Sequence, residues 1–223
     1  MSKQQIIFDG YRAVIEKIKA LDKSGKVKLL CATKTQCVED INYLISLGCT
    51  CIGENRVDEL RQKYDGYDKS AELHFIGTLQ SNKVKYIIDK VSLIHSVDTV
   101  TLLEEIDKRA GKIGKIMDIL IEVNSGREEA KGGVMPEAVP EFYELAKKYP
   151  NVRVRGLMTM APKCTNPEDY KKYFGLTKEL FDSLFANESD AILSMGMSES
   201  FECAIECGAT LVRVGSLVFG KRA

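Results

Sequence analysis

The chain alternates between short apolar runs and longer segments in which apolar residues recur every three or four positions. The first pattern is typical of buried strands and the second of amphipathic helices. The predicted strands are residues 28–34, 49–54, 72–77, 91–97, 115–124, 152–160, 190–197 and 209–215. The predicted helices between them are residues 37–48, 56–67, 79–89, 100–111, 136–149, 167–186 and 200–207.

Eight strands that alternate with helices predict a parallel sheet with right-handed crossovers. A closed (β/α)8 TIM barrel is the simplest α/β fold for such a regular repeat, and 223 residues suit it. Residues 2–24 carry apolar side chains at helical spacing, which predicts an extra N-terminal helix. A short helix is expected after Ser216. No linker or low-complexity tract interrupts the chain, so we expect a single domain over residues 1–223.

The charges of the chain balance, with 32 basic and 32 acidic residues and a formal net charge of zero. Nucleic-acid-binding proteins usually carry a basic excess or a basic face, so no nucleic-acid partner is expected. No apolar stretch approaches the roughly 20 residues that span a bilayer, so no membrane association is expected either.

Seven cysteines occur in a chain without an apparent secretory leader, which predicts free thiols in a reducing cytoplasm. The pairs Cys49/Cys51 and Cys203/Cys207 lack a neighbouring histidine cluster. A spacing of two on a strand places Cys49 and Cys51 on one face, where small buried apolar residues are the simpler interpretation. No metal is assigned from the sequence.

Candidate chemistry gathers where a barrel of this kind binds phosphate, at the loops after strands seven and eight. Ser198 follows the seventh strand, and Gly215 and Ser216 follow the eighth, close to the start of a helix. Arg213 lies two residues before Gly215, so both face the barrel interior or its rim. Lys34 ends the first strand, which closure of the barrel places beside the eighth.

An amine close to a phosphate anchor suits a Schiff base with a phosphorylated aldehyde. Taken alone, a lysine at a strand end is more often a solvated terminus. A Gly-Ser pair fits tight packing as readily as phosphate binding. Both alternatives stay open at this level, as does the identity of the aldehyde.

Several short motifs carry a family resemblance that spans nearly the whole chain. They are the segments 32–35, 52–56, 74–77, 80–83, 94–98, 155–160, 194–198 and 213–220, which read ATKT, IGENR, HFIG, QSNK, IHSVD, RGLMTM, SMGMS and RVGSLVFG. In this order they resemble the pyridoxal phosphate homeostasis protein family, which is related in fold to the barrel of alanine racemase. Two positions depart from the pattern: Thr78 stands where histidine is common, and Glu199 where aspartate is usual.

The resemblance implies a fold type III protein that binds pyridoxal 5'-phosphate (PLP) as a Schiff base on Lys34. It also implies phosphate contacts from Ser198, Gly215 and Ser216 and places Arg213 opposite the pyridine nitrogen. Asn55 and Met158 match positions near the cofactor ring. His74 and Ser96 match motif positions whose roles are not assigned.

An arginine opposite the ring nitrogen keeps its own proton and leaves the pyridine unprotonated, which weakens the ring as an electron sink. We therefore expect no catalytic residues and a non-catalytic role in vitamin B6 homeostasis that affects amino-acid balance. PLP-dependent apoenzymes are conceivable acceptors, and a monomer is expected.

One alternative is a weak PLP-dependent amino-acid racemase or related enzyme. It would need a second acid/base, which related racemases take from a second domain that we do not expect here. Another alternative is an aldolase-like barrel that acts on a sugar phosphate.

Overall fold

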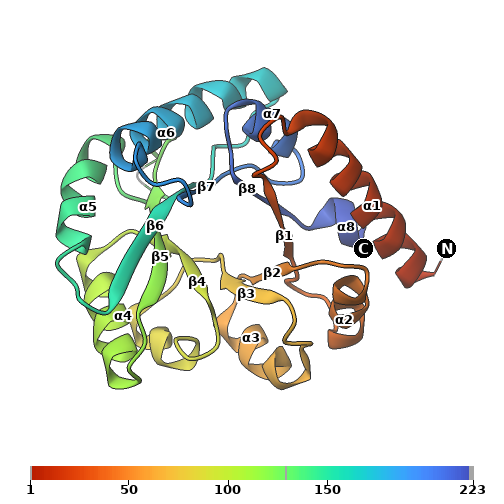
Figure 1. Ribbon diagram of the computed structural model, residues 1–223, viewed down its shortest axis with the longest axis horizontal. Helices are drawn as coiled ribbons and strands as arrows, with labels where there is room; N and C mark the ends of the chain where they lie inside the picture. Colours follow the sequence, from red (N-terminus) through yellow and green to blue (C-terminus); the bar gives the residue numbers. More distant parts are fainter. Residues whose placement is uncertain (1, 129, 221–223) are drawn as a thin grey trace.

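The computed structural model describes residues 2–128 and 130–220, in which eight parallel strands close into a barrel (Figure 1). Residues 1, 129 and 221–223 of the predicted domain lie outside the described residues. The closed barrel confirms the predicted fold. The strands are β1 (Lys28–Ala32), β2 (Cys51–Glu54), β3 (Glu72–Phe75), β4 (Leu93–Val97), β5 (Met117–Val123), β6 (Val152–Thr159), β7 (Ile192–Ser194) and β8 (Leu211–Val214).

Helices surround the barrel on its outside, as Figure 1 shows. They are α1 (Lys3–Leu21), α2 (Val38–Ser46), α3 (Val57–Lys63), α4 (Val100–Lys112), α5 (Val139–Ala146), α6 (Tyr170–Phe185), α7 (Phe201–Glu206) and α8 (Ser216–Phe219). Short 3-10 turns are η1 (Tyr64–Gly66), η2 (Ser81–Tyr86), η3 (Pro136–Ala138) and η4 (Pro167–Asp169). Within the described residues, no helix is both long and apolar enough to cross a membrane.

The predicted helix at residues 79–89 is the clearest local difference, because the structure has only the 3-10 segment η2 there. Bonds from the Lys83 amide to the Gln80 carbonyl and from the Ile87 amide to the Val84 carbonyl span three residues. Three residues per turn align side chains at positions i and i+3. This winding places Val84 and Ile87 on one face, and both are fully buried.

The extra N-terminal helix is confirmed, and it covers the gap left by a short final helix. Helix α8 has four residues, whereas α1 has 19 and lies against α8, α2 and α7. Helix α1 buries Ile7, Val14 and Ile18. Its Gly10 allows close approach, because a Cβ there would lie 2.3 Å from the Leu217 carbonyl oxygen. Helix α1 thus supplies the apolar cover that a full eighth helix gives in a regular barrel.

The barrel interior combines small apolar clusters with a set of buried polar side chains. Leu30, Cys51, Ile76 and Leu211 form one apolar cluster. Leu93, Leu120 and Met158 form another. The polar set consists of buried side chains, among them His74, His95, Glu122, Ser194 and Arg213. Because buried polar groups need partners, this set indicates a hydrogen-bonded network inside the barrel.

Substitution of Gly156 is expected to disrupt the pairing of β6 with β7. Gly156 has φ +145°, and a Cβ there would lie 2.0 Å from the Ile192 carbonyl oxygen on β7. We expect Gly156→Ala to lower the free energy of unfolding by at least about 2 kcal/mol, as measured by urea denaturation. The matched control is Gly175→Ala in α6, where no atom lies within 4 Å of the added methyl group. The control should stabilise the protein by up to about 1 kcal/mol. Equal stabilities for the two variants would contradict this account of β6.

Candidate functional site

A cavity of about 660 Å³ opens at the carboxyl ends of the strands, the face on which barrels of this kind carry their sites. Its lining includes most of the residues predicted for the cofactor. These are Lys34, Asn55, Ser198, Arg213, Gly215 and Ser216. The structure therefore brings together Arg213 of β8 and residues that follow β1, β2, β7 and β8, although they are up to 182 positions apart in the sequence.

Met158 lies apart from this group. Its side chain is 1% exposed and packs against Leu93 and Leu120 inside the barrel, and it is not among the residues that line the cavity. On β6 it pairs with Ser194 of β7 and Glu122 of β5. Contact between Met158 and a cofactor ring remains a prediction.

The sequence pattern predicts Lys34 as the last residue of the first strand. In the structure, Lys34 lies instead in a turn just after β1. The strand ends at Ala32, and the Gln36 amide donates to the Thr33 carbonyl to close the turn. Thr35 takes a left-handed conformation (φ 67°), which is costly for a β-branched residue. Its amide donates to Glu59 Oε2 at 2.8 Å. These bonds hold a strained turn that keeps the half-buried Lys34 at the cavity.

The fully buried carboxylate of Glu54 anchors the base of this turn. Its Oε1 accepts bonds from Thr33 Oγ1 at 2.8 Å and Tyr67 Oη at 2.7 Å, and Lys63 Nζ lies 3.3 Å away. Bonds to a charged acceptor are stronger than neutral ones. Burial and the nearby Glu54 charge raise the pKa of the Tyr67 phenol, which stays a donor. Glu54 belongs to the IGENR segment, yet the sequence alone did not reveal its structural role.

Arg213 extends into the barrel beneath the cavity and is 5% exposed. Its Nη1 donates to Ser194 Oγ at 2.6 Å and its Nη2 donates to the Thr159 carbonyl at 3.0 Å. Burial lowers the pKa of the guanidinium to about 10, and the charge of Glu122 opposes this shift. Arg213 is therefore still a cation at neutral pH, and the predicted interior position of this residue is confirmed.

A chain of hydrogen bonds continues from Arg213 through the barrel interior. Ser194 Oγ lies 3.1 Å from His95 Nδ1, and His95 Nε2 lies 3.0 Å from His74 Nδ1. Burial, first of all, and the neighbouring His74 and Arg213 lower the pKa of His95 well below its usual value. Since His95 is neutral, it donates through one ring nitrogen and accepts through the other.

The loops after β7 and β8 meet at the cavity. The Gly215 amide donates to Ser198 Oγ at 3.3 Å, which joins the two loops directly. Gly196 has φ 85°, and a Cβ there would lie 2.5 Å from the Ala204 Cβ atom, so this turn requires glycine. Ser216 opens α8, where the amides of Val218 and Phe219 donate to the Gly215 carbonyl. A small anion would find hydroxyl groups and amides of a helix start here.

Asn55 provides a direct test of whether the cavity suits a polar ligand. Its Oδ1 atom is buried and has no hydrogen-bond partner within the part of the chain that the structure describes. A buried acceptor without a partner costs free energy that a ligand donor would recover. Gly77 packs so closely on this segment that a Cβ would lie 2.1 Å from the Asn55 carbonyl oxygen. The position of Asn55 is therefore tightly constrained, and its unpaired atom fits a polar ligand.

Several lining residues escaped the sequence analysis, among them Tyr170 and Lys163. Tyr170 is buried, starts α6 and accepts a hydrogen bond at its Oη from the Cys164 amide. Lys163 is exposed on the preceding loop. Tyr170 falls within the helix predicted at residues 167–186, and Lys163 falls between this helix and the predicted strand before it, so neither position indicates a ligand site. Of the two departures from the family pattern, Glu199 lines this cavity, whereas Thr78 lines a smaller neighbouring hollow together with Asn55.

A barrel with this cavity is the architecture of the alanine racemase N-terminal domain, and the family model of that description matches residues 11–223. More narrowly, the chain belongs to the pyridoxal phosphate homeostasis protein family. It is 50% identical over 217 residues to the protein of that name from Aquifex aeolicus, covering 94% of this chain and 95% of the relative. The Helicobacter pylori relative of the same name is 35% identical over 209 residues, covering 92% and 93%. The predicted family is confirmed.

Solved structures agree with this classification. PipY of Synechococcus elongatus PCC7942, solved with PLP bound, has a TM-score of 0.81 at 27% identity and covers 92% of this chain and 99% of its own. A protein from Bifidobacterium adolescentis reaches a TM-score of 0.91 at 31% identity, covering 97% and 96%. Diaminopimelate decarboxylase from M. jannaschii shares the fold alone, with a TM-score of 0.79 at 16% identity over 98% of this chain and 60% of that chain.

Glu122 is expected to make the stability of the protein depend on pH. Burial and the charge of Asp98 raise the pKa of this carboxyl to about 7, although Arg213 opposes the shift. The folded state therefore holds a proton that the unfolded state, with a pKa near 4.3, has lost. Stability from this group is present below about pH 4 and falls as pH rises to about 7, by about 4 kcal/mol at most.

Glu122→Gln should remove this fall, measured as the free energy of unfolding in urea between pH 5 and pH 8. The matched control is the exposed Glu141→Gln, which should keep the slope of the wild type. An unchanged slope in Glu122→Gln would show that another group is responsible.

Proposed function

We propose that this chain binds PLP in the cavity at the carboxyl ends of the strands, with the Lys34 amine holding its aldehyde as a Schiff base. The observation that carries the proposal is the convergence of Lys34, Arg213 and the joined Ser198–Gly215 loops on one cavity. It is supported by family membership and by the PLP bound to PipY. Bound PLP would supply a reactive aldehyde and a conjugated ring.

Each residue predicted to bind the cofactor has a chemical role in this proposal. Ser198, Ser216 and the Gly215 backbone hold the phosphate at the junction of the two loops. Asn55 offers its side-chain oxygen Oδ1, which has no partner within the described residues, to a donor on the ring or on a water molecule. Arg213 faces the pyridine nitrogen as a permanent cation. Met158 supports the floor beneath the ring from inside the barrel.

The proposed activity is non-catalytic storage or delivery of PLP in vitamin B6 homeostasis, with an effect on amino-acid balance. A guanidinium with a pKa of about 10 does not share its proton with a pyridine at neutral pH, so the ring stays a weak electron sink. Residues 1–223 would act as one PLP-binding domain and as a monomer, with PLP-dependent apoenzymes as acceptors. All seven cysteines are free, which favours the cytoplasm.

Weak racemase or related activity on amino acids is the second candidate, and Tyr170 is the observation that favours it. A phenol is a feasible acid or base, and Tyr170 lines the same cavity as Lys34. Its hydroxyl already accepts a bond from the Cys164 amide, so it keeps its own proton available to donate.

Borohydride reduction tests where the cofactor is attached. Purified protein should absorb visible light, and reduction followed by peptide mass spectrometry should add the PLP mass to Lys34. Lys34→Ala should lose both signals. Lys163→Ala, which removes the other lysine that lines the cavity, should keep them. A protein that cannot be reconstituted with PLP, or that is labelled at Lys163, would contradict the proposal.

Exchange of the amino-acid Cα proton separates storage from catalysis. We expect no multiple-turnover deuterium incorporation into a panel of amino acids by the wild type, because the ring is a weak electron sink. Incorporation that depends on Lys34 and falls at least about tenfold in Tyr170→Phe would instead establish the enzyme, with Tyr170 as acid or base. The readout is proton NMR of the amino acid in deuterated buffer, with Lys34→Ala as the blank.

A further inference from the structure

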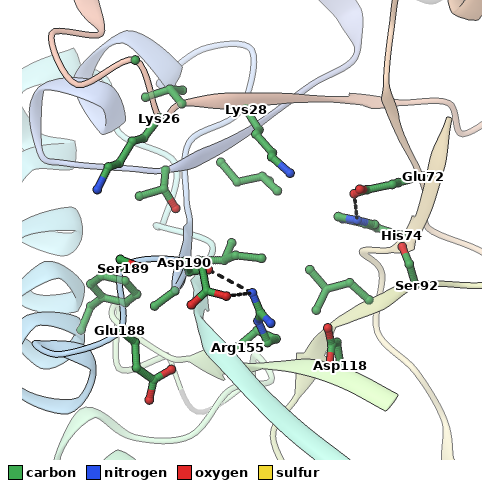
Figure 2. Close-up of a pocket in the computed structure, with 18 of the residues that line it drawn as sticks. Lys26, Lys28, Glu72, His74, Ser92, Asp118, Arg155, Glu188, Ser189 and Asp190 are labelled. Atoms are coloured by element: carbon green, nitrogen blue, oxygen red, sulfur yellow. Dashed lines mark hydrogen bonds and ion pairs between the residues drawn. The ribbon is translucent and has the colours of Figure 1, made fainter. Parts of the chain in front are cut away.

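A second cavity, of about 760 Å³, lies at the opposite end of the barrel, where the strands begin. Figure 2 shows its lining, which includes Lys28, Glu72 and His74. The Arg155 side chain in this cavity pairs with Asp190 at 2.7 Å. Nothing in the proposed PLP chemistry uses this end of the barrel.

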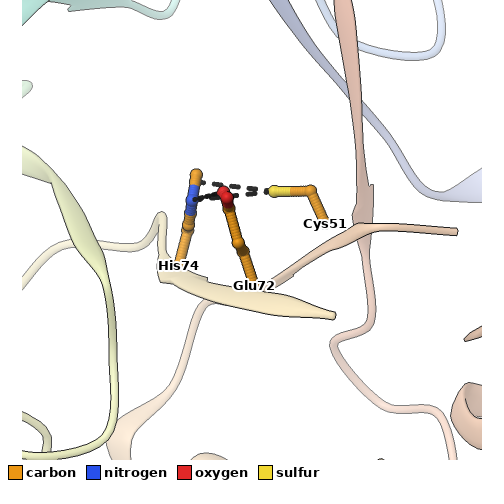
Figure 3. Close-up of side chains that lie close together, drawn as sticks. All are labelled: Cys51, Glu72 and His74. Carbon is orange, nitrogen blue, oxygen red and sulfur yellow. Dashed lines mark hydrogen bonds and ion pairs between the residues drawn. The ribbon is translucent and has the colours of Figure 1, made fainter. Parts of the chain in front are cut away.

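Three potential metal ligands converge beside this cavity: the thiol of Cys51, the carboxylate of Glu72 and the imidazole of His74 (Figure 3). Within the described residues they form the one group of at least three such side chains whose ligand atoms all lie within 4.8 Å of one another. His74 Nε2 lies 3.4 Å from Glu72 Oε2 and 3.7 Å from Cys51 Sγ. Cys51 and His74 are 3% and 4% exposed, so two of the three ligands are built into the barrel.

The pairing of β2 with β3 creates this group. Cys51 is the register partner of Glu72, and His74 lies two residues further along β3, so all three side chains face the interior. Cys49 does not take part, because β2 begins at Cys51. Cys49 packs in the outer core and Cys51 in an inner cluster. The expectation that Cys49 and Cys51 share one face is therefore wrong.

The distances suit a tetrahedral zinc ion. With bonds of about 2.0 Å to nitrogen, 2.1 Å to oxygen and 2.3 Å to sulfur, the edges of such a tetrahedron are roughly 3.4 to 3.6 Å. The observed separations of 3.4 Å and 3.7 Å match these edges with small adjustments of the side chains. Three protein ligands leave a fourth position, which the cavity can supply with water.

His74 is already oriented for this role by a neighbour. Its Nδ1 lies 3.0 Å from His95 Nε2, which leaves Nε2 to face Glu72, while Cys51 Sγ lies 3.7 Å from each of the two ring nitrogens. With a metal on Nε2, the ring proton lies on Nδ1 and is donated to His95. His95 then donates through Nδ1 to Ser194 Oγ. A histidine ligand whose second nitrogen is held by an outer partner is the usual arrangement at protein metal centres.

Charge balance also favours a divalent cation. The Cys51 thiolate and the Glu72 carboxylate together neutralise two positive charges. Burial raises the pKa of the Cys51 thiol, which releases its proton when it binds a metal. Lys28 starts β1 beside the two groups, and its charge acts to lower the pKa of both. Its flexible side chain can turn into the open cavity when a metal displaces it.

We propose that Cys51, Glu72 and His74 form a zinc site at the amino-terminal end of the barrel, with His95 as its outer partner. This site is separate from the proposed PLP site and does not depend on it. Access is through the 760 Å³ cavity.

Zinc competition with a chromogenic chelator tests the site in the full chain after metal removal. The wild type should take up one equivalent of Zn²⁺. Cys51→Ser and His74→Gln should weaken the affinity at least about 100-fold, and His95→Leu about 10- to 100-fold. Glu72→Gln changes a side chain that is 56% exposed, so it should fold normally and still weaken binding about tenfold or more. The matched control, Cys207→Ser, removes a thiol from the Cys203/Cys207 pair and should leave the affinity unchanged.

Cobalt supplies a readout that a purely structural role would not move. Co²⁺ bound at this site should show tetrahedral d–d absorption with a thiolate charge-transfer band, and the band should disappear in Cys51→Ser. Absence of stoichiometric Zn²⁺ uptake by the wild type would overturn the proposal. The proposal would also be overturned if Cys51→Ser and Glu72→Gln bound Zn²⁺ with the affinity of the wild type, or if Cys207→Ser lost Zn²⁺ uptake. A cooperative unfolding transition in urea confirms that Cys51→Ser is folded.

Discussion

The buried guanidinium of Arg213 constrains most of the barrel interior. A cation removed from water must be met by acceptors, and here it meets Ser194 Oγ and the Thr159 carbonyl. Its charge also depresses protonation of His95 and opposes the raised pKa of Glu122. The interior therefore contains a polar column where many barrels pack only branched aliphatic side chains. Of these buried polar residues, Arg213 also lines the cavity above it.

The helices outside the barrel must cover the place where β8 pairs with β1 to close it. The register places Leu30 beside Arg213 and Cys31 beside Val214, so the turn that carries Lys34 leaves the barrel next to the Gly215 loop. A four-residue α8 cannot cover this seam, and α1 does so. Lys3 Nζ donates to the Phe219 carbonyl, which ties the start of the chain to the end of α8. Strands and helices far apart in sequence thus complete one wall of the site.

Much of this could be predicted from the sequence, because strand and helix periods are local and the order of eight repeats restricts the topology. The proximity of Lys34, Arg213 and the Gly215 loop follows from the strand ends and the closure of the barrel, whereas the ligand was implied only by the family resemblance. The anchoring of Thr33 by Glu54 does not, since it depends on the register of β1 against β2. Tyr170 reaches the cavity through the path of a loop, which no periodicity encodes. The grouping of Cys51 with His74 likewise depends on the pairing of β2 with β3. The spacing of Cys49 and Cys51 led to the wrong prediction that both lie on one face.

The chain of hydrogen bonds from His74 through His95 and Ser194 to Arg213 has a direction, because each link has one donor and one acceptor. A neutral imidazole carries a single ring proton, so two linked imidazoles and a hydroxyl admit only two self-consistent orders of donor and acceptor. In one order every proton points toward Glu72, and in the other every proton points toward Ser194. An interaction that fixes the order of donors and acceptors at the amino-terminal ends of the strands also fixes it at their carboxyl-terminal ends. The two ends of the barrel then share a single binary state, although no side chain moves between them.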